Sequence, residues 1–181
     1  MKFHTIETKR LLLRKLSPSD FTHIFENYSE SEIKLFLGLQ SQDEFEKEKN
    51  KYLHGYTTYN RSIEVFQLLD KTSLAIIGSC GFHNWYFDHN RAELGYMIKD
   101  ISNRSQGLMT EALHAVIEHG FTKMNLHRIE ALVGTENTPS LKLMQKFKFT
   151  QEGILRQHYF INDKYEDSAL FSLLKEEYLL S

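Results

Sequence analysis

The stretch Asn103-Arg104-Ser105-Gln106-Gly107-Leu108-Met109-Thr110-Glu111-Ala112 organises the rest of the chain. It follows a strand-like run, Ala92 to Lys99, and opens the strongest helical pattern in the sequence. A loop that turns from a strand into a helix presents backbone N–H groups that have no intrahelical partner. The helix dipole adds partial positive charge at the same place. The stretch therefore predicts an anion site, suited to phosphate or pyrophosphate.

The segments around this stretch follow a strand–helix–strand order. Gly107 to Met124 carries apolar residues at three- and four-residue steps, which is typical of a helix that packs on a sheet. Arg128 to Val133 then predicts a second strand, parallel to the first through a right-handed crossover. Thr138-Pro139 begins another helix, because proline is favoured at the first helical position.

The remaining patterns predict antiparallel strands joined by short turns, one helix that begins near Asp20, and a second helix that covers roughly Asp43 to Tyr59. The expected strands are 10–16, 63–69, 74–83, 91–99, 128–133, 151–160 and 166–174. Together these elements predict an α+β fold with a mixed, mostly antiparallel sheet and one parallel pair at its centre.

The composition is typical of a single globular domain, expected over residues 1–181, since 41% of the residues are hydrophobic and 25% are charged. A net charge of −2 provides no basic footprint for nucleic acid. The lone Cys80 cannot form an internal disulfide and suits a reducing compartment. No run approaches the roughly 20 apolar residues of a membrane helix, and the N-terminus has no signal-like run. We therefore expect a cytoplasmic protein without a nucleic-acid or membrane partner.

Four blocks, spread over almost the whole chain, resemble the motifs of one enzyme superfamily. TKRLLLR from Thr8 is similar to a T-x-R-L-x-L-R strand, and AELGY from Ala92 is similar to an A-E-I-G-Y strand. Arg104 to Ala112 resembles a Q/R-x-x-G-x-G/A pyrophosphate loop followed by T-E-A. Asn137 to Gly153 resembles N-x-x-S-x-x-L-x-x-K-x-G-F-x-x-E-G. In this order the blocks resemble the GNAT superfamily of acyl-CoA-dependent N-acetyltransferases, and within it the RimJ/RimL branch.

The resemblance implies the GNAT fold, with six to seven strands, a central splayed parallel pair and flanking helices, and acetyl-CoA as cosubstrate. The pantetheine arm would pair with the backbone of Met97, Ile98 and Lys99, and Asn137 would reach it from the other side. The pyrophosphate would lie on the amides of Arg104, Ser105, Gln106, Gly107, Leu108, Met109 and Thr110. Because Met109 stands where the family has a small residue, its side chain must point away from the ligand.

Acetyl transfer to an amine calls for a general base, since an amine must be neutral to attack and amine pKa values run from about 7.7 to 10.4. Glu93 is the first candidate for this base. It has an alternative interpretation as a structural glutamate, solvated or paired with Arg91. Tyr159, His158 and Glu111 compete for the same role, although an acidic residue in a first helical turn, such as Glu111, is favoured by the dipole alone.

Ser140 is the candidate that would protonate or stabilise the leaving thiolate. Many GNAT enzymes carry a tyrosine four residues further on, where this chain has Met144, and the RimJ/RimL branch has serine at the position of Ser140. The alternative is that Ser140 only caps its helix. A backbone N–H near Met97 or Ile98 is the candidate donor to the oxyanion. Cys80 is interpreted as a core thiol, and no H-x-E-x-H or C-x-x-C spacing predicts a metal site.

The sequence thus predicts direct acetyl transfer from acetyl-CoA to a primary amine. By resemblance the acceptor is a protein N-terminal α-amino group of the ribosomal-protein type. The alternatives are a small-molecule amine (a polyamine, an antibiotic or an amino sugar) and a non-catalytic acyl-CoA-binding module. A nucleotide-binding protein is a weaker alternative, because the Lys-Ser/Thr of a P-loop does not follow Gly107. An exposed strand edge near the C-terminus would permit a homodimer.

Overall fold

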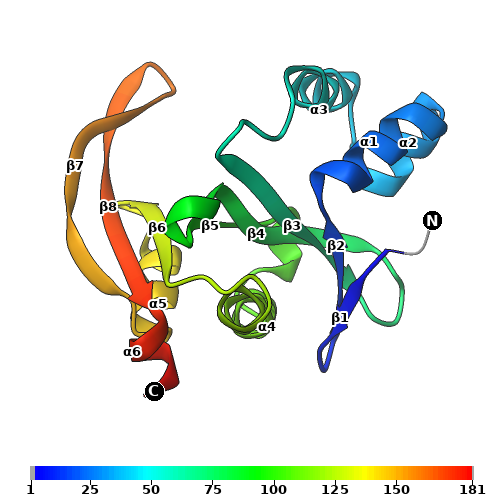
Figure 1. Cartoon of the computed structure of the whole chain (residues 1–181). Helices are drawn as coiled ribbons and strands as arrows, with labels where there is room; N and C mark the ends of the chain where they lie inside the picture. The colour runs from blue at the N-terminus through cyan, green and yellow to red at the C-terminus, as the bar shows by residue number, and fades with distance from the viewer. Residues whose placement is uncertain (1–2, 181) are drawn as a thin grey trace.

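Eight strands form one sheet within residues 3–180, the part of the chain that the structure, a computed structural model, describes. The order across the sheet is β1-β2-β3-β4-β5-β6-β8-β7 (Figure 1). The strands are β1 (Thr5–Glu7), β2 (Leu11–Leu16), β3 (Arg61–Asp70), β4 (Ile76–Tyr86), β5 (Arg91–Ile98), β6 (Arg128–Gly134), β7 (Thr150–Ile161) and β8 (Lys164–Leu174). Among the described strands only β5 and β6 pair in parallel, which confirms the predicted mixed, mostly antiparallel sheet with one parallel pair.

The count of eight exceeds the expected six to seven strands because of β1. This strand has three residues and pairs with β2 through Thr5–Arg14 and Glu7–Leu12. A segment so short offers no alternating pattern, so its sequence alone does not predict a strand. It forms because β2 leaves an open edge on that side of the sheet.

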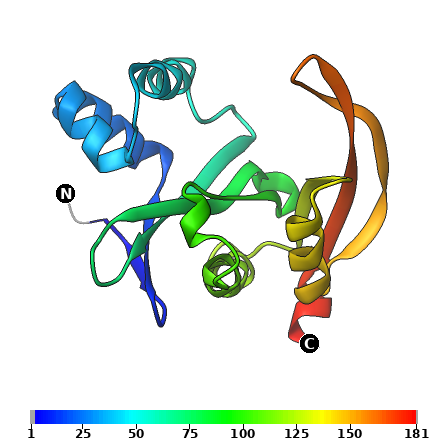
Figure 2. The same cartoon turned by 180° about the vertical axis from the view of Figure 1, so that it is seen from behind.

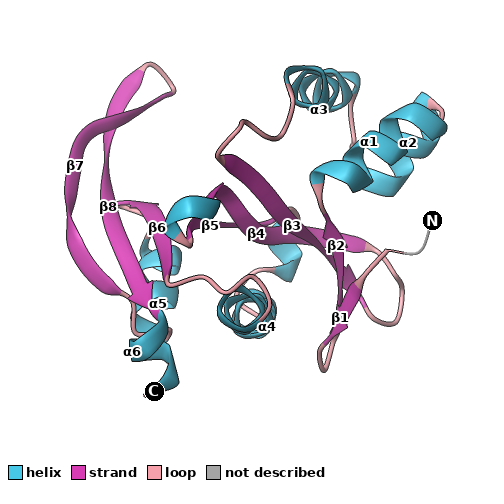
Figure 3. Ribbon diagram, viewed as in Figure 1, coloured by secondary structure: helices cyan, strands magenta, loops and turns pink. Residues whose placement is uncertain are grey.

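Along the sequence the described helices separate or follow the strands, and in space they lie outside the sheet (Figure 3). They are α1 (Pro18–Asn27), α2 (Glu30–Leu37), α3 (Gln42–His54), α4 (Leu108–Thr122), α5 (Thr138–Lys146) and α6 (Lys175–Leu179), with short 3₁₀ turns at Phe87–His89 and Ile101–Asn103. Ser17, Ser29 and Ser41 cap the first three helices by accepting a backbone N–H three residues on. Helix α3 ends at His54, short of the expected Tyr59, because Gly55 adopts a φ of 81°.

The helices cover the two faces of the sheet unequally, as the two opposite views show (Figures 1 and 2). Helix α4 lies against one face and buries Ala112, Leu113 and Val116 in the main core, which also holds Met144 of α5. Helices α1 to α3 lie on the other face, over β2 and β3, and form a second, smaller core. The sheet near β5 and β6 is therefore free of α1 to α3, and this is where a site can form.

The parallel pair is closed at one end and open at the other. β5 and β6 pair only at Arg91–Arg128, Ala92–Ile129 and Glu93–Glu130, and then diverge. Ion pairs fasten the closed end, because Glu130 accepts from Arg91 Nη1 and from Arg128 Nε, each at 2.8 Å. The predicted central splay is thus confirmed, and it opens toward the carboxyl ends of both strands, where ligands of such sheets bind.

Candidate functional site

The loop before α4 presents free backbone amides. Ser105 (φ 59°) and Gly107 (φ 75°) both take left-handed conformations, and Gly107 is the N-cap of α4 without a side-chain cap bond. The first intrahelical bond runs from the Glu111 N–H to the Gly107 carbonyl, at 3.0 Å. The N–H groups of Leu108, Met109 and Thr110 therefore point out of the helix end, at its positive pole, which is the arrangement that binds an anion.

A brace from the N-terminal segment fixes this loop from behind. Glu111 Oε1 accepts from Thr8 Oγ1 and from the Arg10 N–H, each at 2.6 Å, and Arg10 Nε donates to Glu111 Oε2 at 2.7 Å. Arg10 Nη1 also donates to the Gln106 carbonyl at 3.0 Å. Burial acts to raise the pKa of the Glu111 carboxyl, but the bonds from Thr8 and Arg10 outweigh it and lower the pKa. Glu111 is occupied by the brace, and this argues against it as a general base.

Helix α5 supplies the second helix start. Asn137 is its N-cap, and Asn137 Oδ1 accepts from the Ser140 N–H at 3.2 Å. The cap is therefore the side chain of Asn137 and not that of Ser140, whose hydroxyl is left for another role. Met144 is fully buried in the main core and offers no group that could donate a proton to a ligand.

A cavity of about 430 Å³, here called the loop cavity, lies between the two helix starts and the open end of β5. Most residues predicted to bind the cosubstrate line it: Met97, Ile98, Arg104, Ser105, Gly107, Leu108, Met109, Thr110, Asn137 and Ser140. Lys99 and Gln106 do not, and their side chains donate to the carbonyls of Gly38 (2.5 Å) and Ser102 (2.6 Å). Met109 is 8% exposed and belongs to the main core.

The hydrogen bonding of β5 decides which backbone groups face the open splay. The Lys99 N–H donates to the Ile77 carbonyl of β4 at 3.0 Å, and Met97 lies opposite Ser79. Because bonding groups alternate along an antiparallel strand, Met97 and Lys99 direct their backbone toward β4, and Ile98 directs its own toward β6. Of the three residues expected to pair with a ligand arm, the register therefore favours Ile98.

A second cavity, of about 280 Å³ and here called the Glu93 cavity, adjoins the first. Its lining includes His83, Glu93, Gly95 and Tyr159, and it shares Tyr96, Asn137 and Ser140 with the loop cavity. The two cavities thus meet at a junction made by Tyr96, Asn137 and Ser140. One molecule in each cavity could come into contact there.

Glu93 has two partners from β4, and sequence reasoning identified neither. His83 Nε2 lies 3.1 Å from Glu93 Oε1, and Asn84 Nδ2 donates to Glu93 Oε2 at 3.0 Å. Burial acts to raise the pKa of the Glu93 carboxyl, but His83 and Asn84, aided by the charge of His158, outweigh it and lower the pKa. Glu93 is therefore an ionised carboxylate, paired with His83 rather than with Arg91, which is bound to Glu130.

A β-bulge explains how two consecutive residues reach one carboxylate. The pairing of β4 with β5 passes from His83–Glu93 to Tyr86–Arg91, so β4 carries one extra residue, and Asn84 takes a left-handed φ of 47°. In a regular strand consecutive side chains point to opposite faces. Bulges of this kind re-aim side chains beside active sites, and here the bulge directs Asn84 to the side of His83.

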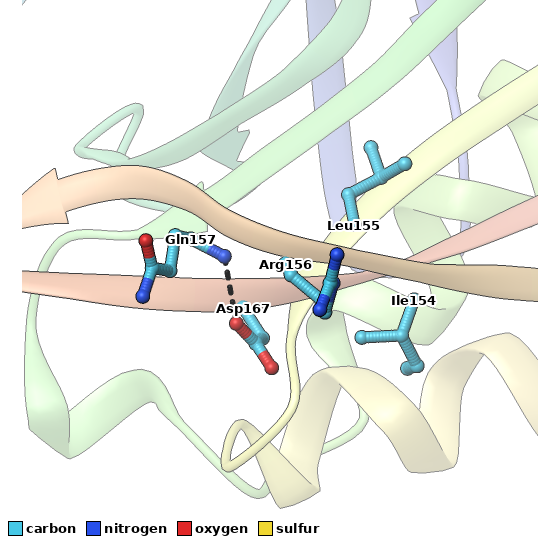
Figure 4. A pocket seen from close by; sticks show the side chains of 5 residues that line it. All are labelled: Ile154, Leu155, Arg156, Gln157 and Asp167. Carbon is cyan, nitrogen blue, oxygen red and sulfur yellow. Dashed lines mark hydrogen bonds between the residues drawn. The ribbon is translucent and has the colours of Figure 1, made fainter.

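The opposite wall of the Glu93 cavity comes from a second irregular strand, β7. Its pairing with β8 passes from Leu155–Ser168 to Tyr159–Glu166, so β7 carries two extra residues. Figure 4 shows this segment, where the Gln157 N–H donates to Asp167 Oδ1 at 2.7 Å. The shallow hollow there lies on the outer hairpin and shares no residue with the other two cavities.

Tyr159 and His158 follow this irregularity, and only Tyr159 lines the Glu93 cavity. Burial raises the pKa of the Tyr159 phenol, and the charge of Glu93 raises it further. A phenol with a raised pKa stays protonated near neutral pH and is a poor base. Tyr159 therefore has the wrong protonation state for a base, and His158 lies outside the cavity lining.

The junction holds a buried polar group without a hydrogen-bond partner in residues 3–180, the Tyr96 hydroxyl. Burial raises the pKa of this phenol, and the nearby Ser140 hydroxyl opposes the shift in part without reaching hydrogen-bond geometry. An unpartnered buried hydroxyl is costly. A ligand atom at the junction would find both hydroxyls close by.

Cys80 lies away from these cavities, in the core under α4, and is 2% exposed. Burial raises the pKa of its thiol, so the nucleophilic thiolate is disfavoured. Within residues 3–180, no group of three or more His, Cys, Asp or Glu residues is arranged to hold a metal ion. None of the helices in that range has the length and apolar character to cross a bilayer.

Comparison with known proteins identifies the family. Residues 10–150 match the family model described as an acetyltransferase (GNAT) domain. An uncharacterized N-acetyltransferase of Bacillus licheniformis is 34% identical, over 96% of this chain and 98% of its own length. The crystal structure of mutant forms of a spermidine/spermine N-acetyltransferase from Vibrio cholerae superposes with a TM-score of 0.69 at 25% identity, covering 94% of this chain and 98% of that one.

A ribosomal-protein-S5-alanine acetyltransferase from Vibrio fischeri shares the fold as well. Its TM-score is 0.69 at 23% identity, over 97% of this chain and 98% of that one. At this identity the likeness concerns the fold alone.

Proposed function

Because the chain belongs to the acetyltransferase (GNAT) family, we propose that it transfers the acetyl group of acetyl-CoA directly to a primary amine within one ternary complex. The domain of residues 1–181 would act as a unit of the RimJ/RimL type. The observation that carries the proposal is the junction at Tyr96, Asn137 and Ser140, where the loop cavity meets the Glu93 cavity. A donor in the first cavity and an amine in the second would bring their reacting atoms together there.

The loop cavity fits acetyl-CoA by the chemistry of its groups. The free amides of Leu108, Met109 and Thr110 suit the pyrophosphate, because a helix N-terminus favours negative charge. The Ile98 N–H faces the open splay and suits a carbonyl of a pantetheine arm, whereas the Ile98 carbonyl accepts from Arg104 Nη2 at 3.4 Å. Asn137 uses its Oδ1 on the helix cap, so its Nδ2 remains available to the same arm.

In the reaction the amine nitrogen forms a bond to the thioester carbon, and the carbonyl electron pair moves to oxygen. An N–H such as that of Ile98 would stabilise this oxyanion. The nitrogen loses its proton on the side of the cavity that holds Glu93. The C–S bond then breaks, and the thiolate keeps the electron pair and is stabilised by the Ser140 hydroxyl until it is protonated.

We propose a protein N-terminal α-amino group as the acceptor. Glu93 is the one acidic residue that lines its cavity within the described chain, which suits an acceptor with a single positive charge. An α-amino group has a pKa of about 7.7–8.0 against about 10.4 for lysine, so less help is needed to make it neutral. The motif resemblance to the RimJ/RimL branch supports the same acceptor.

A small-molecule amine is the second candidate. It is favoured by the likeness to the spermidine/spermine N-acetyltransferase of Vibrio cholerae. An acceptor screen separates the two candidates: peptides with varied N-terminal residues, the same peptides with blocked N-termini, spermidine and amino sugars, each read by release of free thiol from acetyl-CoA. The proposal predicts turnover with free N-termini and its loss on blocking. Turnover with spermidine alone would contradict the peptide acceptor.

Two variants distinguish an enzyme from a non-catalytic acyl-CoA-binding module. Glu93→Gln and Ser140→Ala should each lower kcat by about 10-fold or more, while calorimetry shows acetyl-CoA affinity within about threefold of wild type. Unchanged turnover in both variants would contradict the roles given to these residues. A wild-type protein that binds acetyl-CoA and acetylates none of the amines would support the module, and binding of ATP in place of acetyl-CoA would support a nucleotide-binding protein.

A further inference from the structure

The imidazole of His83 lies beside Gly95, two residues along β5 from the carboxylate it pairs with. A Cβ added to Gly95 would lie 2.4 Å from His83 Cε1 and 3.0 Å from Nδ1, so the ring occupies the space that the missing side chain of Gly95 leaves. Gly95 directly precedes Tyr96, a residue of the junction. The ring thus extends from Glu93 along β5 toward the place where the two cavities meet.

The two ring nitrogens have different surroundings. Nε2 lies 3.1 Å from Glu93 Oε1, and beside a carboxylate this nitrogen is the one that carries the hydrogen. Nδ1 has no hydrogen-bond partner in residues 3–180. The His83 side chain is 43% exposed, against 17% for Glu93, and it lines the Glu93 cavity, so a molecule there can reach the ring. The second carboxylate oxygen is occupied by Asn84.

Proton affinity favours an imidazole over this carboxylate as the acceptor of the amine proton. An ordinary imidazole has a pKa of about 6.5. Proton transfer to it from an α-ammonium of pKa about 7.7–8.0 is therefore unfavourable by a factor of about 15 to 30. For an ordinary glutamate, with a pKa of about 4.3, the unfavourable ratio is about 2,500-fold or more. Since His83 and Asn84 lower the pKa of Glu93, the difference is larger here.

We infer that His83 Nδ1 takes the proton of the acceptor amine, and that Glu93 positions the imidazole through Nε2. This inference rests on the proposed function and names the proton acceptor within it. The N–H bond of the ammonium breaks, its proton goes to Nδ1, and the freed electron pair forms the bond to the thioester carbon. The bonded nitrogen then carries two hydrogens and a positive charge, and it releases one of these protons to solvent as the C–S bond breaks and the amide forms. The imidazolium that results is stabilised by Glu93 and later returns its proton to solvent, which also supplies the proton that the thiolate takes up.

The charged and titratable groups around His83 come from three strands. Glu93 of β5 is its partner, and Tyr159 of β7 lines the same cavity while His158 of β7 acts on Glu93 through its charge. Glu130 of β6 is next to Glu93 in the parallel pair but is bound by two arginines. Glu93 is therefore the carboxylate free to hold an imidazolium.

The first test measures kcat/KM from pH 5 to pH 9 for wild type, His83→Gln, Glu93→Gln and the exposed control His54→Gln. His83→Gln should lower kcat/KM about 100-fold or more and remove the acidic limb of the profile. Glu93→Gln should keep that limb and shift it to lower pH, because a neighbouring negative charge has been removed. His54→Gln should match wild type. Loss of the limb in Glu93→Gln, with less than a threefold effect of His83→Gln, would overturn the inference, and so would an equal loss in His158→Gln.

Two further readouts keep the inference separate from folding defects and from failure of the proposed function. Free imidazole should restore activity to His83→Gly at least about 10-fold and should not affect Glu93→Gln; no rescue, with acetyl-CoA binding intact, counts against His83.

Nitrogen NMR of the wild-type protein tests the geometry without any turnover. It should show His83 protonated at Nε2 and unprotonated at Nδ1 near pH 8. A hydrogen on Nδ1 would overturn the inference even if the protein proves to be an acetyltransferase, whereas failure to acetylate any amine would overturn the proposed function.

Discussion

The loop cavity is built on backbone amides of one continuous stretch, whereas the Glu93 cavity is built on side chains that separate strands bring together. In the first, Leu108, Met109 and Thr110 present their N–H groups in succession. In the second, His83 of β4 and Tyr159 of β7 meet Glu93 of β5 through strand irregularities. Amides recognise a phosphate in any sequence context, while side chains select one acceptor. The donor side can therefore be shared within a family while the acceptor side differs.

The largest effect is expected from Gly107→Val, which tests the loop side alone. Gly107 has a φ of 75°, and a left-handed conformation costs a β-branched residue about 1–3 kcal/mol. If the loop shifts to escape this strain, acetyl-CoA affinity should fall by up to about 100-fold, and calorimetry measures it. The control Gly153→Val lies in β7, where an added Cβ meets nothing within 4 Å, and should bind acetyl-CoA like wild type.

If Gly107→Val instead leaves affinity for acetyl-CoA intact and raises the KM of the amine, the two sides are not separate. The division between a backbone-built donor side and a side-chain-built acceptor side would then be wrong.

A smaller effect on the same side is expected from Arg10→Gln. Arg10 links Glu111 to the Gln106 carbonyl, but its side chain is 42% exposed, so the brace contributes about 1 kcal/mol. The KM for acetyl-CoA should rise about fivefold, with kcat unchanged, because Arg10 holds the loop and touches no reacting atom. Lys34→Gln, which removes an exposed ion pair with Glu30 far from the loop, is the matched control. A fivefold fall in kcat would contradict this prediction, because it would mean that Arg10 acts in the chemical step.

The ion pairs of Arg128 with Glu130 and Glu152 lie at the closed end of the parallel pair, on which both cavities depend. The variant Glu152→Gln tests their contribution to stability. Arg128 lowers the pKa of Glu152 to about 2, and Ser172 adds a hydrogen bond. Because the folded-state pKa lies below the ordinary value of 4.5, this contribution to stability is present above about pH 4.5 and is lost as the pH falls toward about 2. Urea unfolding of wild type should weaken across that window, and Glu152→Gln should weaken less. If the free energy of unfolding depends on pH in the same way for both proteins, Glu152 does not make this contribution.

The smallest effect on activity is expected at Cys80, which belongs to neither side. Cys80→Ala should keep kcat within about twofold of wild type, since a buried thiol with a raised pKa is inert and direct transfer needs no acyl-enzyme. Thiol-release kinetics measure it. Acetylation of Cys80 during turnover, seen by mass spectrometry, would contradict direct transfer.

The same difference explains what the sequence could predict. The anion site of the loop from Arg104 to Thr110 could be predicted from the sequence, because it is formed by consecutive backbone amides and by a glycine that takes a left-handed conformation. The strand–helix–strand order around it predicted the parallel pair, and this was confirmed. Residues expected to contact the cosubstrate remain predictions, although ten of them line one cavity.

The rest depends on contacts between distant residues. Nothing in the sequence pairs His83 with Glu93, because the register that sets them opposite each other depends on a bulge. Thr8 and Glu111 each belong to a recognisable motif, yet their hydrogen bond spans 103 positions of the chain and appears only in three dimensions. Strand β1 was missed because three residues have no periodicity, and its pairing is supplied entirely by β2.

The central claim is that an acetyl group passes across the junction of the two cavities to an amine. A single-turnover mixture of the protein, one equivalent of acetyl-CoA and an excess of an accepted peptide, analysed by mass spectrometry, tests it most directly. The account predicts one acetyl group on the peptide's α-amino nitrogen, an equal amount of free coenzyme A, and no acetylated protein. Unmodified peptide beside bound, intact acetyl-CoA, or acetyl found on the protein itself, would contradict it.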